Sequence, residues 1–178
     1  MNQENQETMK RPVTAQIRAG NVARAITDGE LLLATVDVPS PPERVFRALM
    51  TDECEHWWGA PGVYTTEAWH AEVRNGGTWS LITRLPDGTR LPASGEFIEV
   101  DAPTRVVQTR RYDWDHPTLG RGATRVTTLL HPTDGGTRVT VRHDGFSASQ
   151  TAFEHAGGWE RLLDWLRDYL AAEMDGKR

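Results

Sequence analysis

The sequence of 178 residues is long enough for one domain with a hydrophobic core, and its hydrophobic share of 38% and charged share of 25% are typical of a globular protein. A formal net charge of −5 at pH 7 argues against general nucleic-acid binding, because no excess of Lys and Arg can neutralise phosphates. No stretch reaches the roughly 18 apolar residues that suggest a membrane-spanning helix. We therefore expect neither nucleic acid nor a membrane among the partners.

Cysteine usage and the N-terminus favour a cytoplasmic location. Cys54 is the single cysteine of the sequence, which excludes an internal disulfide. The flanking Glu53 and Glu55 are expected to raise the pKa of the thiol, so a nucleophilic role for Cys54 is not favoured. The first residues, MNQENQETMKRPVTAQ, lack the apolar core of a signal peptide.

The N-terminal part divides into a tail and an extension. Residues 1–14 are polar and without apolar periodicity, so we predict a disordered tail. Residues 15–27 are mildly amphipathic, and both a short helix and a strand fit them. Residues 28–176 are predicted to form the domain itself.

The domain begins with a strand and short helices. The run at 30–38, with Gly29 before it and Pro39 after it, predicts a strand. SPPERVFRALMTD at 40–52 predicts a helix with Ser40 as N-cap and Glu43 completing a capping box. The chain then reaches the adjacent Trp57 and Trp58 before a Gly/Pro loop. Since neighbouring side chains rarely face the same way, one tryptophan can turn inward as part of the cavity wall while the other packs outside, against the first helix or a neighbouring molecule. The alternative is that both tryptophans simply fill the core.

Residues 66–144 alternate between strand-like runs and turn signals. Asn75-Gly76 and Asp87-Gly88 are strong hairpin turns. About six antiparallel strands follow from this spacing, and pairing with the strand at 30–38 makes about seven.

The last segment, from Ser147 to Gly176, predicts one long helix. Trp159, Leu162, Leu163, Leu166, Tyr169 and Leu170 recur at helical spacing and form one apolar stripe. Gly157-Gly158 interrupts the pattern at a cost of about 1 kcal/mol per glycine. Either the helix breaks there, or it passes close to the sheet or to a ligand. The fold class is thus α+β, with a curved antiparallel sheet wrapped around a C-terminal helix and a cavity left between them.

Several motifs in order resemble a known superfamily. VPSPPERVFRALMTDECEHWWG, RNGGTWS, GEFIEVDAPTRVVQT, GGTRVTVRHDGF and GWERLLDWLRDYL are similar to the START-like helix-grip (SRPBCC, Bet v 1-like) superfamily, and most of all to its activator of Hsp90 ATPase (AHSA1)-like branch. The resemblance implies a hydrophobic cavity and spans residues 28–172. Members include lipid carriers, hormone receptors and cyclases. We expect no Hsp90-type chaperone as partner, because the stretch before the first predicted strand is too short for a chaperone-binding domain.

Large side chains that can face the cavity define the candidate ligand site. They are Trp57, Trp58, Trp79, Phe97, His143, Trp159 and Leu163. Such an aromatic set suits a flat apolar ligand, and it equally suits a packed interior.

Polar side chains near the cavity leave alternatives open. In RVVQTRRYDW, either Gln108, Arg110 and Tyr112 or the alternate set containing Arg111 points inward. An inward arginine would bind a carboxylate or phosphate, whereas a surface arginine is solvated. His143 can be a general base or a hydrogen-bonded structural residue. Glu96 points outward if Phe97 points inward.

Metal and cofactor sites are not expected. Asp113, Asp115 and His116 resemble metal ligands only weakly, and no nucleotide-binding or metalloprotease motif occurs. No catalytic residue is assigned. The sequence thus favours binding of a small hydrophobic or amphipathic ligand without turnover. The alternatives are a cyclase, dehydratase or hydrolase that uses the same cavity, and a protein-interaction domain that homodimerises or acts as a co-chaperone.

Overall fold

The computed structural model of the chain describes residues 22–176, and the predicted tail 1–14 and the first part of the extension 15–27 lie outside this range. The elements are β1 Arg24–Asp28, β2 Leu31–Val38, α2 Pro42–Met50, the 3-10 helix η1 Asp52–His56, β3 Thr65–Ala71, β4 Thr78–Arg84, β5 Arg90–Asp101, β6 Arg105–Tyr112, β7 Thr124–Thr133, β8 Gly136–Asp144 and α3 Ser149–Asp175.

The eight strands within residues 22–176 form one antiparallel sheet in the order β1-β2-β8-β7-β6-β5-β4-β3. The predicted pairing of the first strand with the meander is confirmed, because β2 lies beside β8 with Leu32 opposite His143. The sheet has one strand more than the seven predicted, since the end of the N-terminal extension forms β1. Gly29, with a φ of 58°, makes the turn that returns β1 onto β2.

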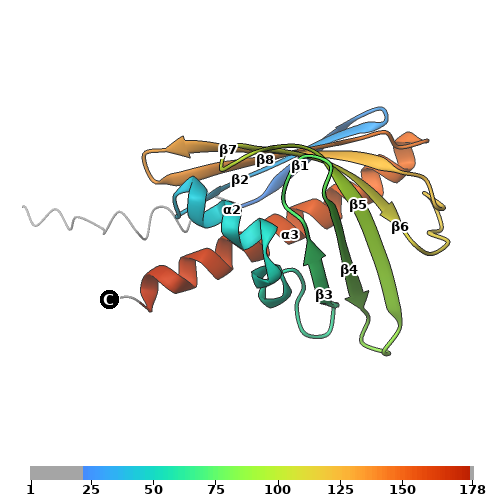
Figure 1. Cartoon of the computed structure of the whole chain (residues 1–178), viewed down its shortest axis with the longest axis horizontal. Coiled ribbons are helices and arrows are strands. Elements are labelled where there is room, and N and C mark those ends of the chain that lie inside the picture. Colours follow the sequence, from blue (N-terminus) through green and yellow to red (C-terminus); the bar gives the residue numbers. More distant parts are fainter. Residues whose placement is uncertain (1–21, 177–178) are drawn as a thin grey trace, which may run out of the picture.

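Helix α3 lies along the concave side of the curved sheet (Figure 1). Leu162, Leu163, Leu166 and Leu170 of its predicted stripe are buried in the core. The predicted α+β helix-grip arrangement is therefore confirmed. A helix break at Gly157-Gly158 is wrong, because α3 runs without interruption from Ser149 to Asp175.

The two short helices after β2 are present, but α2 begins differently from the prediction. Pro41 is its N-cap and no side chain caps the helix, so the predicted Ser40 capping box is wrong. Ser40 is buried instead, and its carbonyl oxygen accepts a hydrogen bond of 2.7 Å from the Thr137 hydroxyl. Proline is tolerated in the first turn of a helix because the backbone N–H groups of that turn have no hydrogen-bond partner within the helix.

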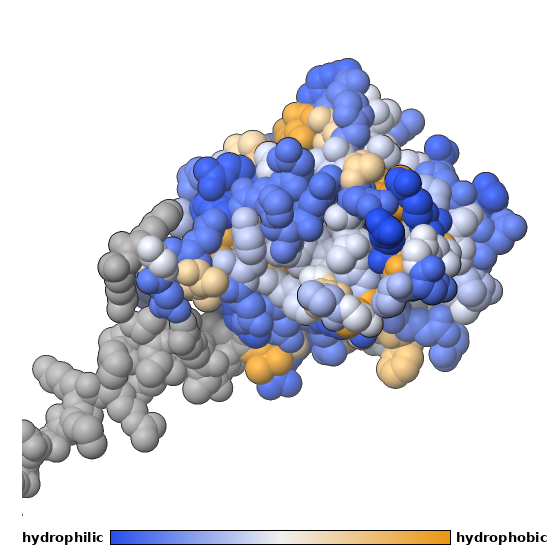
Figure 2. Space-filling view, turned by 90° about the horizontal axis from the view of Figure 1, so that it is seen from below, coloured by the Kyte–Doolittle hydropathy of each residue, from blue (hydrophilic) through white to orange (hydrophobic). Residues whose placement is uncertain are grey.

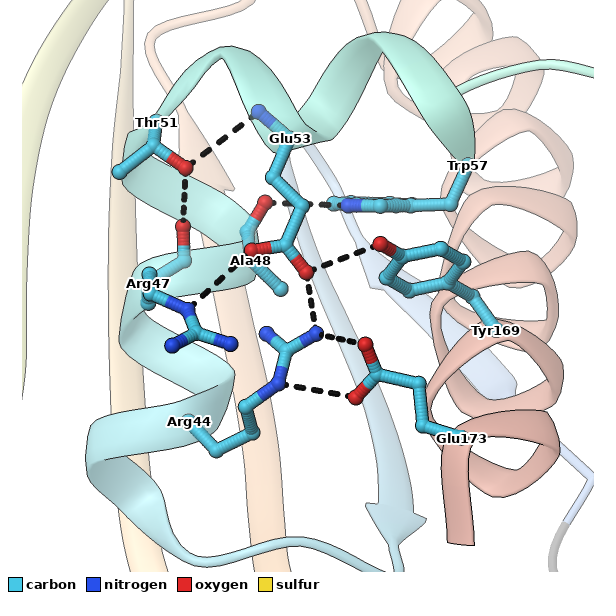
Figure 3. Close-up of polar contacts among 8 residues, drawn as sticks. All are labelled: Arg44, Arg47, Ala48, Thr51, Glu53, Trp57, Tyr169 and Glu173. Carbon is cyan, nitrogen blue, oxygen red and sulfur yellow. Dashed lines mark hydrogen bonds and ion pairs between the residues drawn. The ribbon is translucent and has the colours of Figure 1, made fainter. Parts of the chain in front are cut away.

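A cluster of charged and hydroxyl groups ties α2 and η1 to the C-terminal part of α3 (Figure 3). Arg44 donates to both carboxylate oxygens of Glu173, at 2.9 and 2.6 Å, and also donates to Glu53. The Tyr169 hydroxyl donates to Glu53 at 2.9 Å. Burial opposes the charge of Arg44, but the bonds to Glu173 and Glu53 outweigh burial and raise its pKa.

The face of the molecule seen in Figure 2 is mostly hydrophilic, with hydrophobic residues in small separate patches. Among the described residues, no helix is long and apolar enough to cross a membrane.

Candidate functional site

A cavity of about 370 Å³ lies between the N-terminal half of α3 and strands β6 and β8. Its lining comes from the loop after η1 (Trp58, Tyr64), from β6 (Arg110, Tyr112), from the following loop (His116), from β8 (His143) and from α3 (Glu154, His155, Gly158, Trp159, Arg161, Leu162). This volume falls within the range of about 300–1,000 Å³ that is usual for small-molecule sites.

The tryptophan pair at the end of η1 divides between the core and the cavity. Trp57 is 2% exposed, and its indole N–H donates to the carbonyl oxygen of Ala48 on α2 at 3.0 Å. Trp58 is half-buried and lines the cavity, with its ring centroid 6.3 Å from that of Trp159. The structure therefore answers the question left open by the sequence: Trp57 anchors α2 and Trp58 faces the cavity.

His143 is buried, and both of its ring nitrogens are engaged in hydrogen bonds. The indole N–H of Trp159 donates to Nδ1 at 3.0 Å, so the proton of the neutral ring is on Nε2. Nε2 then donates to the Thr124 hydroxyl at 2.7 Å, and this hydroxyl donates to the backbone carbonyl of Arg110 at 3.1 Å. Burial, followed by the positive charge of Arg110, holds the pKa of His143 well below its usual value. His143 is thus a hydrogen-bonded structural residue, the second of the two roles considered above.

Two further histidines line the cavity in neutral form. His155 donates from Nδ1 to the Thr151 carbonyl at 2.8 Å, which leaves Nε2 to accept the Tyr112 hydroxyl at 3.2 Å. Nδ1 of His116 accepts the backbone N–H of Thr118 at 3.3 Å, so its proton is on Nε2. Burial is the main cause that lowers the pKa of both rings.

Strand β6 turns Arg110 inward, which settles the alternative that the alternation of RVVQTRRYDW left open. Arg110 is 8% exposed, whereas Arg111 is exposed and bonds Ser94 and Asp113 on the outer face. The guanidinium carbon of Arg110 lies 5.4 to 5.6 Å from three aromatic ring centroids, those of Trp58, Trp79 and Tyr112. Ring faces attract cations, so this cage partly compensates the desolvation of the charge.

The remaining predicted ligand residues lie beside the cavity. Trp79 is buried beneath Arg110 and donates its N–H to the carbonyl of Thr109 at 3.1 Å. Trp79 and Leu163 line a small adjoining space of about 20 Å³, while Phe97 is fully buried in the core. Trp58, His143 and Trp159 are therefore the predicted residues that the main cavity brings together. Ligand binding by any of the seven stays a prediction.

Other candidate residues lie away from the cavity or are engaged with neighbours. Glu96 is exposed and lines an open groove on the outer face of β4–β6. Asp113 pairs with Arg111, and Asp115 pairs with Arg121. Within residues 22–176, no group of three or more His, Cys, Asp or Glu side chains could hold a metal ion. Burial, followed by the charges of Glu55 and Asp52, raises the pKa of the Cys54 thiol to about 12.

Sequence reasoning did not assign several residues of the cavity wall. Tyr112 shares the inward face of β6 with Arg110, so its place follows once that register is known. His155 precedes Trp159 by one helical turn, so the two side chains share a face of α3. Because Trp159 was predicted to face the cavity, this spacing could have predicted the same for His155. Tyr64 and His116 come from loops, where periodicity predicts no direction.

Comparison with known proteins identifies the family of this chain. The solved structures it resembles include a Rhodobacter sphaeroides protein (24% identity, 84% of this chain and 98% of that chain covered, TM-score 0.72) and a Chromobacterium violaceum protein (20%, 80% and 98%, TM-score 0.70). A third is described as the AHSA1 protein of Silicibacter pomeroyi (23%, 80% and 99%, TM-score 0.68). These likenesses show the fold.

No curated protein matched the chain. The model of the family described as "Activator of Hsp90 ATPase homolog 1-like protein" matches residues 39–171. The chain belongs to this activator of Hsp90 ATPase homolog 1-like family, with a START-like helix-grip fold.

Proposed function

We propose that the chain binds a small hydrophobic or amphipathic molecule, without turnover, in the cavity between α3 and the sheet. The observation that carries this proposal is the set of half-buried rings that lines the space, Trp58, Tyr64 and Trp159, in a cavity of about 370 Å³. Half-buried rings around a hollow provide an apolar surface that a flat ligand can cover.

Gly158 supports the same proposal. A Cβ atom at Gly157 or Gly158 would meet nothing within 4 Å, so packing against the sheet requires neither glycine. Gly158 nevertheless lines the cavity, whereas Gly157 is exposed. A side chain at position 158 would occupy space that a ligand can use. Of the explanations offered above for Gly157-Gly158, this observation favours close approach of the helix to a ligand over close approach to the sheet.

A pair of leucine variants tests the proposal. Purified protein is titrated with naphthalene, biphenyl and indole derivatives while the melting temperature and the tryptophan fluorescence are recorded. We expect at least one compound to raise the melting temperature of the wild type and of Gly157→Leu by more than that of Gly158→Leu, whose side chain takes up part of the cavity. Equal shifts in both variants, or no shift from any compound, would contradict the proposal.

Catalysis in the same cavity has less support. The enzyme alternative relied on His143, Glu96 or an inward arginine. Arg110 does face the cavity, but both ring nitrogens of His143 are engaged and Glu96 is on the outer face, so neither of these two supplies a free acid or base there. Homodimerisation stays a prediction that sedimentation can test. A cytoplasmic location is part of this proposal and relies on the single cysteine, which is buried.

A further inference from the structure

Arg110 differs from Arg44, an arginine of the described chain that is only partly buried. The Arg44 side chain is 12% exposed and forms ion pairs with Glu53 and Glu173. Arg110 is 8% exposed, yet within residues 22–176 its guanidinium forms no hydrogen bond or ion pair with another side chain. Buried charges are normally paired, because removing them from water is costly.

The aromatic cage accounts for the cation but not for its hydrogen-bond donors. Trp58, Trp79 and Tyr112 surround the guanidinium with ring faces at 5.4 to 5.6 Å. A guanidinium carries five N–H donors in one plane, and a ring face provides no oxygen acceptor for them. Since Arg110 lines the main cavity, these donors can be satisfied by a ligand there.

The other groups around the cavity are also mainly donors. His116 carries its proton on Nε2, because Nδ1 accepts backbone N–H groups. Tyr64 stays protonated, since burial raises its pKa. Arg161 and Glu154 are both exposed and carry opposite charges, which leaves Arg110 as the buried charge of the lining. The wall therefore complements an acceptor with negative charge.

We propose that Arg110 receives a carboxylate group, so that the ligand of this cavity is a small molecule with a flat apolar body and one carboxylate. This inference rests on the proposed binding function. A planar guanidinium matches a planar carboxylate through two parallel hydrogen bonds. A single buried cation also balances a monoanion better than it balances a phosphate dianion. Trp58 and Trp159 then contact the apolar body.

Matched ligands separate this inference from the proposed function. The probes are 2-naphthoate with 2-naphthamide, and indole-3-acetate with indole-3-acetamide, measured by calorimetry on the wild type and on two variants. We expect the wild type to bind the carboxylate about tenfold more tightly than the amide, or better. Arg110→Met should lose this preference. Arg111→Met is the control and should retain it, because Arg111 is on the outer face.

Each outcome has a distinct meaning. If acid and amide bind the wild type equally, the carboxylate inference is overturned while the binding function stands. If neither member of any pair binds, the proposed function itself is overturned for flat ligands. Tighter binding of 2-naphthyl phosphate than of 2-naphthoate would replace the carboxylate with a phosphate and overturn the inference. Should Arg110→Met not fold, the acid-to-amide ratio of the wild type and of Arg110→Lys still decides, since Lys keeps the charge but not the planar fork.

Discussion

Trp159 on α3 donates its indole N–H to Nδ1 of His143 on β8 at 3.0 Å, and this bond joins the helix to the sheet at the cavity wall. The same histidine reaches the backbone of Arg110 through the Thr124 hydroxyl. One buried ring thus fixes the position of an aromatic wall residue and of the strand that carries the buried cation. His143 is therefore a positioning residue for this site.

Replacing His143 with phenylalanine should destabilise the fold. The indole N–H of Trp159 and the hydroxyl of Thr124 would lose a partner in a buried place, at a cost of about 1–3 kcal/mol in the free energy of unfolding. Urea unfolding measures this loss. The exposed His131 is the control, and His131→Phe should change stability by no more than about 0.5 kcal/mol. Equal stability of the two variants would contradict this role.

Stability should fall as the pH drops from about 6.5 towards 5. The pKa of His143 in the folded chain lies well below its ordinary value of 6.5, so the unfolded chain binds more protons in this window. The neutral ring contributes its full stability above pH 6.5, and that contribution is lost progressively below it. The lowered pKa values of His116 and His155 act in the same direction.

His143→Gln should make this pH dependence shallower, because the group that titrates is removed. The free energy of unfolding, measured in urea at several pH values between 7 and 5, gives the slope. His131→Gln, changed at an exposed position, should keep the slope of the wild type. A wild-type stability that is constant or rises as the pH falls through this window would refute the argument.

Three glycine-to-alanine variants should differ in sign. Gly157→Ala and Gly158→Ala should each stabilise the chain by up to about 1 kcal/mol, because both are inside α3 with open space around the added methyl group. Gly95→Ala should destabilise it by about 1–3 kcal/mol, since the added Cβ would overlap the carbonyl oxygen of Thr109 and crowd the ring of Trp79. Thermal unfolding of the three variants tests both signs, and a stabilised Gly95→Ala would be inconsistent with the close approach of β5 and β6.

Arg44→Met should weaken the attachment of α2 and η1 to α3. It removes the bonds to Glu53 and Glu173 and leaves both partly buried carboxylates without this partner, which we expect to cost about 1.5–3 kcal/mol. Arg47 provides a matched control on the same helix (Figure 3), because its side chain is 61% exposed and it contacts Glu53 at 3.3 Å. Arg47→Met should cost about 0–1 kcal/mol in the same denaturant titration. If the two variants were equally stable, the cluster would not hold the helices together.

Local patterns in the sequence were sufficient for the order of the elements after β1 and for the fold class. Asn75-Gly76 and Asp87-Gly88 marked hairpin turns, and the apolar stripe of the last segment predicted α3. These signals are local because turn geometry and helical periodicity depend on residues close together in the chain. The predicted start of α2 was wrong because it depends on a contact that is not local. Ser40 is buried and bonded to Thr137, a residue far away in the sequence.

By itself the sequence determined that β6 has two alternating faces and that Trp57 and Trp58 point different ways. Only the tertiary structure decided that Arg110 and Trp58 face the cavity, while Arg111 and Trp57 do not. The physical reason is that alternation predicts which side chains share a face, whereas the partners on that face come from distant strands and from α3. The cavity exists where α3 and the sheet do not fill the space between them, and the residues that border it meet only in the folded chain.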